Sequence, residues 1–243
     1  MPKVSVEIPC YNCEKYIEET MQSVVNQTYT DWEIVAVDDG STDNSKEVIQ
    51  TFFEKQPDKS KFRYIYQANR GPSVARNTAI RNALGEYIMA LECDDLLAPT
   101  CLAVMAAILD ENPQIGIVGA NVREVEADLS PITWGPEITI TYDLYDPREV
   151  QGLSNCVSPM AMYRKSVWET VGGYNEDLMD CAEDWDFWLR CIDHNQTYQK
   201  VEQVLYTCRH REGSRSAAIY NRSKDRLRTE TNQVLALHNL PLR

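Results

Sequence analysis

Carboxylate side chains gather directly after two apolar segments of this 243-residue chain. They are Asp38 and Asp39, which follow residues 34–37, and Glu92, Asp94 and Asp95, which follow residues 87–91. Neighbouring carboxylates raise one another's pKa unless a cation or hydrogen-bond donors compensate. Mg²⁺ and Mn²⁺ take oxygen ligands of this kind, usually together with the phosphates of a substrate. The two clusters therefore predict a divalent-cation site for a phosphorylated ligand.

The two apolar segments have the length and composition of buried strands. In an open α/β sheet, ligands bind beyond the carboxyl ends of the strands, near a reversal of strand order. Carboxylates at two such ends can therefore face one crevice. The simpler alternative is structural, because Asp38 can cap a turn and Asp95 can cap the helix that opens at Pro99.

Alternating strand and helix patterns surround these clusters. Strands are expected at residues 4–8, 33–37, 63–66, 86–91 and 115–119. Helices are expected at residues 16–25, 44–54 and 99–110, with one more that ends near residue 83. Strands and helices that alternate at this spacing predict an α/β fold with a mostly parallel sheet.

The pattern changes from about residue 122, where prolines and polar residues become frequent. Strands are expected at residues 138–142, 158–163, 197–201 and 204–208, and helices at residues 165–171, 182–193 and 220–237. No linker separates this region from the rest, so we expect one domain over residues 1–243. Its parts are a half that carries the acidic clusters, a smaller mixed region and a helical tail, at residues 1–121, 122–215 and 216–243.

Charge and hydropathy exclude several classes of partner. The formal charge is −13, and binding to a nucleic-acid backbone needs clustered Lys and Arg, so no nucleic-acid partner is expected. No run approaches eighteen apolar residues, and the N-terminus enters a strand without the regions of a signal peptide. We therefore expect a cytoplasmic protein, either free or in peripheral contact with the inner face of the membrane.

Eight cysteines are scattered through a chain that is long enough to fold without disulfides. We expect them to be reduced and mostly buried. Cys10 and Cys13 have the spacing of a redox or zinc half-site, but no second pair or nearby His completes it, so packing is the expected role. His194 and His238 are also expected to be structural.

The acidic clusters belong to a series of short motifs. In chain order these are residues 4–12 (ending Ile-Pro-Cys-Tyr-Asn), 23–29, 37–43 (Val-Asp-Asp-Gly-Ser-Thr-Asp), 69–77, 85–95 with Pro99, 172–174 (Gly-Gly-Tyr) and 183–190 (Glu-Asp-Trp-Asp-Phe-Trp-Leu-Arg). In this order and spacing, the chain resembles the family 2 glycosyltransferases of the GT-A fold. The resemblance implies a Rossmann-like, mostly parallel nucleotide-binding sheet flanked by helices, with a smaller mixed region on the acceptor side.

The resemblance also implies where a nucleotide-sugar would bind. Pro9 and Tyr11 would line the base pocket, where an aromatic ring offers a stacking face, and Asp38 would accept a hydrogen bond from the base. Asp94 matches the last acid of the family's Asp-x-Asp motif and would bind Mn²⁺ or Mg²⁺. Glu92 stands where the family has the first Asp, and its longer side chain is a departure that could alter ribose or metal contact. The other implied nucleotide-binding residues are Asp39, Arg76 and Cys93.

Further residues have two open interpretations each. Asp184 matches the acid that acts as general base in inverting members, although acids also favour a helix start. Arg76 could reach a phosphate or form a structural salt bridge. His210 follows the last expected strand and would be a second metal ligand or a surface residue. Trp185 and Trp188 could form a sugar platform or pack in the core.

The implied activity is a metal-dependent, inverting transfer of a sugar in glycan or polysaccharide assembly. The donor would be a nucleotide-sugar, most often a UDP-sugar in this family, and the acceptor a hydroxyl of a saccharide or a lipid-linked molecule. Two alternatives stay open: a sugar-nucleotide-binding protein that has lost transfer, and a nucleotidyltransferase. The second is disfavoured because no Gly-rich, Lys-bearing loop follows the first strand, and no Gly-x-Gly-x-x-Gly supports an oxidoreductase.

Overall fold

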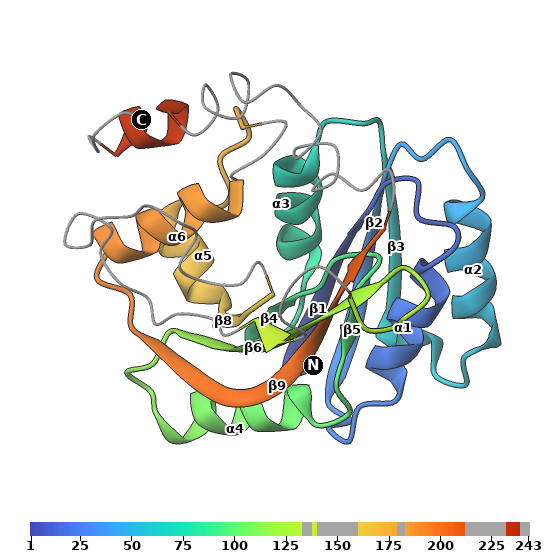
Figure 1. The fold of residues 1–243 in the computed structure, drawn as a ribbon, viewed down its shortest axis with the longest axis horizontal. Coiled ribbons are helices and arrows are strands. Elements are labelled where there is room, and N and C mark those ends of the chain that lie inside the picture. The colour runs from blue at the N-terminus through green and yellow to red at the C-terminus, as the bar shows by residue number, and fades with distance from the viewer. Residues whose placement is uncertain (133–137, 140–159, 179–182, 212–231, 239–243) are drawn as a thin grey trace.

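The computed structural model describes residues 1–132, 138–139, 160–178, 183–211 and 232–238 (Figure 1). Within this part, one sheet forms the centre of the molecule and helices cover it. Its first four strands run parallel in the order β3-β2-β1-β4. They are β1 (Val4–Cys10), β2 (Trp32–Asp39), β3 (Phe62–Gln67) and β4 (Tyr87–Ala90). The alternation expected over the first half of the chain is therefore confirmed.

Beyond β4 the sheet becomes mixed. The next strands are β8 (Met162–Arg164), β6 (Ile117–Glu126), β9 (Tyr198–His210) and β5 (Leu96–Leu97), and β7 (Ile138–Thr139) pairs with β6. β8 is antiparallel to both β4 and β6, whereas β6 and β9 are parallel. The strand expected at residues 115–119 thus starts two residues later and is longer, and β8 separates it from the first four strands.

Helices cover both faces of the sheet. On one face lie α1 (Ile17–Val25), α2 (Ser45–Lys55) and α4 (Cys101–Glu111), and on the other lie α3 (Pro72–Asn82), α5 (Lys165–Val171) and α6 (Glu183–Asp193). Alternate residues of β2 serve the two cores, since Ile34 packs in the first and Val35 in the second. A short helix at residues 232–237 adds Val234 and Leu235 to a small cluster on α6.

Three expectations differ from the structure or lie outside it. Two strands were expected at residues 197–201 and 204–208, but Tyr198–His210 form one strand with irregular pairing. The two-residue strand β5 was not expected. Residues 140–142, 158–159 and 220–231, where strands and a helix were expected, lie outside the described residues, as do Cys156 and Cys181. The six described cysteines are free thiols, as expected.

The strand order reverses beside β1. The chain passes from β1 to β2 and β3 on one side, and then returns to place β4 on the other side (Figure 1). The carboxyl ends of β2 and β4, which carry the two acidic clusters, therefore flank the carboxyl end of β1. Such a reversal is where open α/β sheets bind ligands.

Candidate active site

The carboxyl end of β1 brings three of the expected base-binding residues together. Pro9 and Cys10 pair with Val37 and Asp38 on β2. Tyr11 follows directly and is 47% exposed, so its ring is free to stack on a ligand. Pro9, Tyr11 and Asp38 thus lie at one edge of the sheet.

Asp38 is a buried turn-capping residue that also holds a tyrosine. Its Oδ1 accepts a hydrogen bond from the backbone amide of Ser41 at 2.8 Å, and its Oδ2 accepts one from the hydroxyl of Tyr64 at 2.8 Å. Burial, together with this bond to Asp38, raises the pKa of Tyr64 above its usual value, so the phenol stays protonated as a donor. The turn-capping interpretation is therefore observed, and both oxygens of this 1% exposed residue accept hydrogen bonds within the fold.

Asp39 organises the loop that leads into α3. Its carboxylate accepts hydrogen bonds from the backbone amides of Arg70 and Gly71, at 3.0 and 2.9 Å, and from the side chain of Gln67 at 2.7 Å. Gly71 has a φ of +88°, a left-handed conformation that favours glycine. Asp39 therefore fixes the start of α3 by accepting hydrogen bonds from the backbone that precedes the helix.

Arg76 lies buried in α3 between two carboxylates. Its Nη1 donates to Glu7 on β1 at 2.6 Å, and its Nη2 pairs with Glu92 beyond β4. Burial raises the pKa of Glu7 to about 7, against the opposing effect of Arg76. Of the two interpretations of Arg76, the structure shows the salt bridge. Sequence reasoning missed Glu7, although a lone acid in an apolar strand was a visible signal.

The second acidic cluster is bound by two arginines from the end of β9 and just beyond it, Arg209 and Arg211, which we call the arginine clasp. The Nε of Arg211 donates to Asp94 at 2.5 Å, and the Nε of Arg209 donates to the Asp94 carbonyl at 3.0 Å. The backbone amide of Arg209 donates to Asp95 at 2.8 Å. Both guanidinium groups lie over the ring of Tyr16, 4.9 and 5.4 Å from its centre.

Burial shapes the protonation of this cluster. It is the main cause that raises the pKa of Asp94, and Arg211 opposes it. Burial and the neighbouring Asp94 raise the pKa of Asp95 well above its usual range. Asp95 does not cap α4, as the structural alternative had it, because the cap residue there is Thr100. A divalent cation would favour the charged form of both acids.

Cys93 contributes to the cluster through its backbone. Its carbonyl accepts hydrogen bonds from the thiol of Cys13 and the hydroxyl of Thr20, both at 3.0 Å. Cys10 and Cys13 are 1% exposed, which agrees with the packing role expected for them. These contacts tie the loop after β4 to the start of α1.

His210 stands at the end of β9 beside a different acid. Its Nε2 is 2.7 Å from Glu124 Oε2 on β6. Asp94 forms a salt bridge with the guanidinium of Arg211 instead. Asp94 and His210 thus have different partners in the structure, Arg211 and Glu124.

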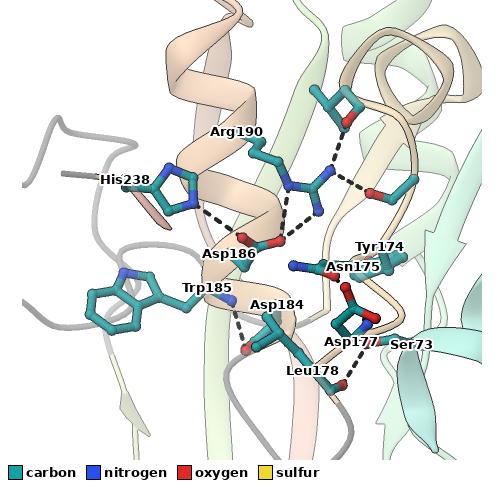
Figure 2. A network of polar contacts seen from close by, with 12 residues as sticks. Ser73, Tyr174, Asn175, Asp177, Leu178, Asp184, Trp185, Asp186, Arg190 and His238 are labelled. Carbon is teal, nitrogen blue, oxygen red and sulfur yellow. Dashed lines mark hydrogen bonds and ion pairs between the residues drawn. The ribbon is translucent and has the colours of Figure 1, made fainter. Parts of the chain in front are cut away.

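Asp184 lies in the first turn of α6, where it contacts the backbone of its own helix. Its Oδ1 accepts a hydrogen bond from the amide of Trp185 at 2.8 Å (Figure 2). Trp185 and Trp188 are 7% and 0% exposed, so both pack in the core and neither offers a face to a sugar. Acids at a helix N-terminus are stabilised by its dipole.

A polar network fixes α6 behind Asp184. Asp186 Oδ2 accepts two hydrogen bonds from Arg190, at 2.9 and 2.7 Å, and Arg190 also donates to the carbonyls of Val171 and Gly173 (Figure 2). Gly173 has a φ of +79°, and a Cβ there would meet Asn77 on α3 at 2.9 Å. The Gly-Gly-Tyr motif therefore links α3 to the helix that carries Asp184.

His238 joins this network. Its Nε2 lies 3.1 Å from Asp186 (Figure 2), and its Nδ1 lies 3.1 Å from Asp193, so the structural role expected of it is a contact with two acids. Burial alone would lower the pKa of His238, but the hydrogen bonds to these two acids outweigh it and raise the pKa. The contact over 45 residues left no pattern in the sequence.

Glu92, Asp94 and Asp95 carry carboxylate oxygens, the ligands that Mg²⁺ and Mn²⁺ prefer. Each of the three acids is bonded to an arginine: Glu92 to Arg76, Asp94 to Arg211, and Asp95 to the backbone amide of Arg209. The positions facing Glu92 and Asp94 are filled by cationic guanidinium groups, which shows that this edge of the sheet attracts positive charge. No helix among the described residues is long and apolar enough to cross a membrane.

Many known proteins are similar to this chain, among them the following three. The chondroitin synthase of Escherichia coli is 31% identical over 206 residues, which cover 85% of this chain and 29% of that protein. The crystal structure of Staphylococcus aureus TarS 1-349 in complex with UDP-GlcNAc aligns with a TM-score of 0.74 and 25% identity, over 96% of this chain and 66% of that one. The mannosyltransferase PcManGT from Pyrobaculum calidifontis, in complex with GDP-Man and Mn²⁺, shares the fold with a TM-score of 0.65 and 22% identity, over 98% and 63% of the two chains.

The family can be stated from these findings. The chain spans less than a third of the length of the chondroitin synthase that it matches. The family model described as Glycosyl transferase family 2 matches residues 5–172, which is more than half of the chain. The curled sheet with helices on both faces agrees with the fold of TarS. The chain therefore belongs to glycosyl transferase family 2 and has the GT-A fold.

Proposed function

We propose that this protein transfers a sugar from a UDP-sugar to a hydroxyl group of a glycan acceptor, with a divalent cation bound at Asp94. The observation that carries the proposal is the convergence of Tyr11, Asp38 and Asp94 at the ends of three neighbouring strands, β1, β2 and β4. This edge offers a stacking face, a buried acceptor for a base and a cation ligand. The similarity to TarS, whose crystal complex contains UDP-GlcNAc, supports a uridine donor.

The metal part of the proposal rests on the donor set. Asp94 is the main ligand, with Glu92 as a candidate for a second protein contact; His210, the other metal ligand expected from the sequence, is paired with Glu124 instead. When bound, the cation neutralises charge that develops on the diphosphate leaving group. The fold neighbour PcManGT was solved with GDP-Man and Mn²⁺, which supports a divalent cation of this kind. The side chain of Arg211 holds Oδ2 of Asp94, so a cation binds through Oδ1 or displaces the guanidinium.

The proposed general base is Asp184. An acceptor hydroxyl must lose its proton as it attacks the anomeric carbon, and a positioned carboxylate can take it. The network of Asp186, Arg190 and His238 holds the first turn of α6, which carries Asp184. The backbone position of Asp184 is therefore fixed. Direct displacement would invert the anomeric centre, as in the family members that this chain resembles.

The acceptor and the location are proposed at the level of class. The similarity to a chondroitin synthase supports a saccharide acceptor in polysaccharide assembly. A lipid-linked saccharide is compatible with peripheral contact at a membrane surface. Residues 133–137 and 140–159, within the region that we assign to the acceptor side, lie outside the described residues.

Calorimetric titration with UDP, GDP and dTDP, each with and without Mn²⁺, tests the proposal. We expect UDP to bind most tightly and only with Mn²⁺, and we expect Asp94→Ala to abolish the metal dependence. Asp58→Ala removes an exposed acid at a distant turn and should bind like the native protein. The absence of metal-dependent binding to every nucleotide would contradict the proposal.

Turnover separates a transferase from a binding protein. Asp184→Asn should keep UDP binding and lower the rate of sugar transfer by about 10²–10⁴-fold, the usual contribution of a positioned base. If the native protein binds UDP with metal yet transfers no sugar to any saccharide acceptor, it is a sugar-nucleotide-binding protein. Release of pyrophosphate from a nucleoside triphosphate and a sugar phosphate would instead identify a nucleotidyltransferase.

A further inference from the structure

Three side chains with metal-binding atoms meet at the ends of β6 and β9. Among the described residues, Glu124, Cys208 and His210 form a group whose ligand atoms all lie within 4.8 Å of one another. Glu124 supplies an oxygen, Cys208 a sulfur and His210 a nitrogen. The proposed donor site at Asp94 needs neither Glu124 nor Cys208.

The backbone itself brings these three residues together. Cys208 and His210 are two residues apart on β9, so their side chains leave the same face of the strand. Glu124 stands directly opposite Cys208 in the parallel pairing of β6 and β9. A register shift between Ala120 and Val122 sets this pairing. The cluster thus rests on two sheet strands rather than on a flexible loop.

The group is partly exposed, so a metal ion could enter and leave it. The side chains of Glu124 and His210 are 16% and 31% exposed, and Cys208 is partly buried against the core. Three protein ligands with one side open to solvent are the arrangement of zinc sites that keep a free coordination position. A closed structural site would need a fourth protein ligand.

The geometry is close to what zinc requires. Tetrahedral Zn²⁺ with bonds of about 2.0–2.3 Å separates its ligand atoms by roughly 3.3–3.7 Å. The separation of 2.7 Å between His210 Nε2 and Glu124 Oε2 must therefore widen by roughly half an ångström on binding. Rotation of two partly exposed side chains accomplishes this without a change in the backbone.

We propose that Glu124, Cys208 and His210 form a second cation site, selective for a borderline-soft divalent metal such as Zn²⁺. Thiolate and imidazole ligands favour Zn²⁺ and Co²⁺ over Mg²⁺ and Mn²⁺, which prefer oxygen. Bound Zn²⁺ with one thiolate, one carboxylate and one neutral imidazole carries no net charge. This site is distinct in chemistry from the all-oxygen cluster at Asp94.

Titration of the reduced protein with Co²⁺ in place of Zn²⁺ tests the proposal. We expect one equivalent of Co²⁺ to produce a thiolate charge-transfer absorption, which Zn²⁺ then abolishes by displacement. Cys208→Ser should lose this absorption and lower the Co²⁺ affinity by at least about 100-fold, the upper range for loss of a residue that merely supports a ligand. Its Mn²⁺-dependent UDP binding should remain, which shows that the fold is intact.

Two control variants assign the signal. Asp94→Ala and Cys93→Ser remove an acid of the donor site and a buried thiol near it, and both should keep the Co²⁺ absorption. Glu124→Gln should weaken Co²⁺ binding without removing the thiolate band. No thiolate absorption in the native protein, or a band that survives Cys208→Ser, would overturn the proposal and leave an ordinary His–Glu ion pair.

Discussion

At the end of β2, Asp39 accepts hydrogen bonds from the backbone amides of Arg70 and Gly71, whereas beyond β4 Asp94 accepts one from the side chain of Arg211. Backbone donors stay where the fold puts them, but a guanidinium on a flexible stem can swing away. The first acid is therefore held by the framework, whereas the second is held by a side chain that can move. Two clusters that look alike in sequence thus have different roles.

Arg76 belongs to the fixed side of this comparison although it contacts the second cluster. Its guanidinium is fully buried and its partner Glu7 is equally buried, so neither can turn to solvent. Removal of one member of a buried pair leaves a charge without compensation. Glu92 therefore belongs to the fixed side through its pair with Arg76, whereas Asp94 is held by the side chain of Arg211.

Arg76→Met should give the largest loss of stability. At pH 8, above the pKa of about 7 for Glu7, we expect the free energy of unfolding to fall by about 3–5 kcal/mol. At pH 5 the loss should be smaller, because native Glu7 then carries a proton and leaves no buried charge. Urea unfolding at the two pH values measures both. The double variant Glu7→Gln with Arg76→Met should recover part of the loss, and no recovery would place the effect elsewhere.

Asp39→Ala and Asp94→Ala form a matched pair of intermediate effect. Loss of Asp39 leaves two partly buried amides without their acceptor, so the free energy of unfolding should fall by about 1–3 kcal/mol. Loss of Asp94 should change it by less than about 0.5 kcal/mol, because Arg211 can turn to solvent. Thermal or urea unfolding of the metal-free proteins compares them. Equal losses would remove the distinction between the two acids.

Arg211→Ala should give the smallest effect, and its sign is informative. The ion pair to Asp94 competes with the cation, and such a pair is worth about 1 kcal/mol, so Mn²⁺ affinity in the presence of UDP should rise about 5-fold. Calorimetry with Mn²⁺ measures this. Arg81→Ala, which removes an exposed guanidinium paired with Glu176, should leave the affinity unchanged. A weaker Mn²⁺ affinity for Arg211→Ala would mean that Arg211 supports the donor.

The elements of the first half follow from local patterns. Val4, Val6 and Ile8 alternate with period two, and the apolar runs at residues 34–37 and 87–91 end at the acids that mark a strand terminus. Local hydrogen bonds, such as the amide of Ser41 on Asp38, also follow from turn chemistry. These expectations held because neighbours in sequence remain neighbours in the fold.

The partners of the acids did not follow from the sequence. Arg211 lies 117 residues from Asp94, and His238 lies 52 residues from Asp186, so no periodicity connects them. The sequence predicts two strands where β9 forms, because exposed Glu202 and Gln203 interrupt the apolar pattern. The irregular pairing of β9 with β6 accommodates these residues and lets the strand continue. Long-range pairing of this kind leaves no mark on a single chain.

The distance along the chain between Asp94 and the arginine clasp also orders events during protein synthesis. Asp39 lies 32 residues before Gly71, which at about 5–20 residues per second is made about 2–6 s later. Arg211 is made about 6–23 s after Asp94 at the same rate, because 117 residues separate them. A nascent chain can therefore complete the β2 loop while it is still on the ribosome. Asp94 and Asp95 stay without the arginine clasp until the end of β9 emerges, so the contacts at this edge of the sheet form later than those of the β2 loop.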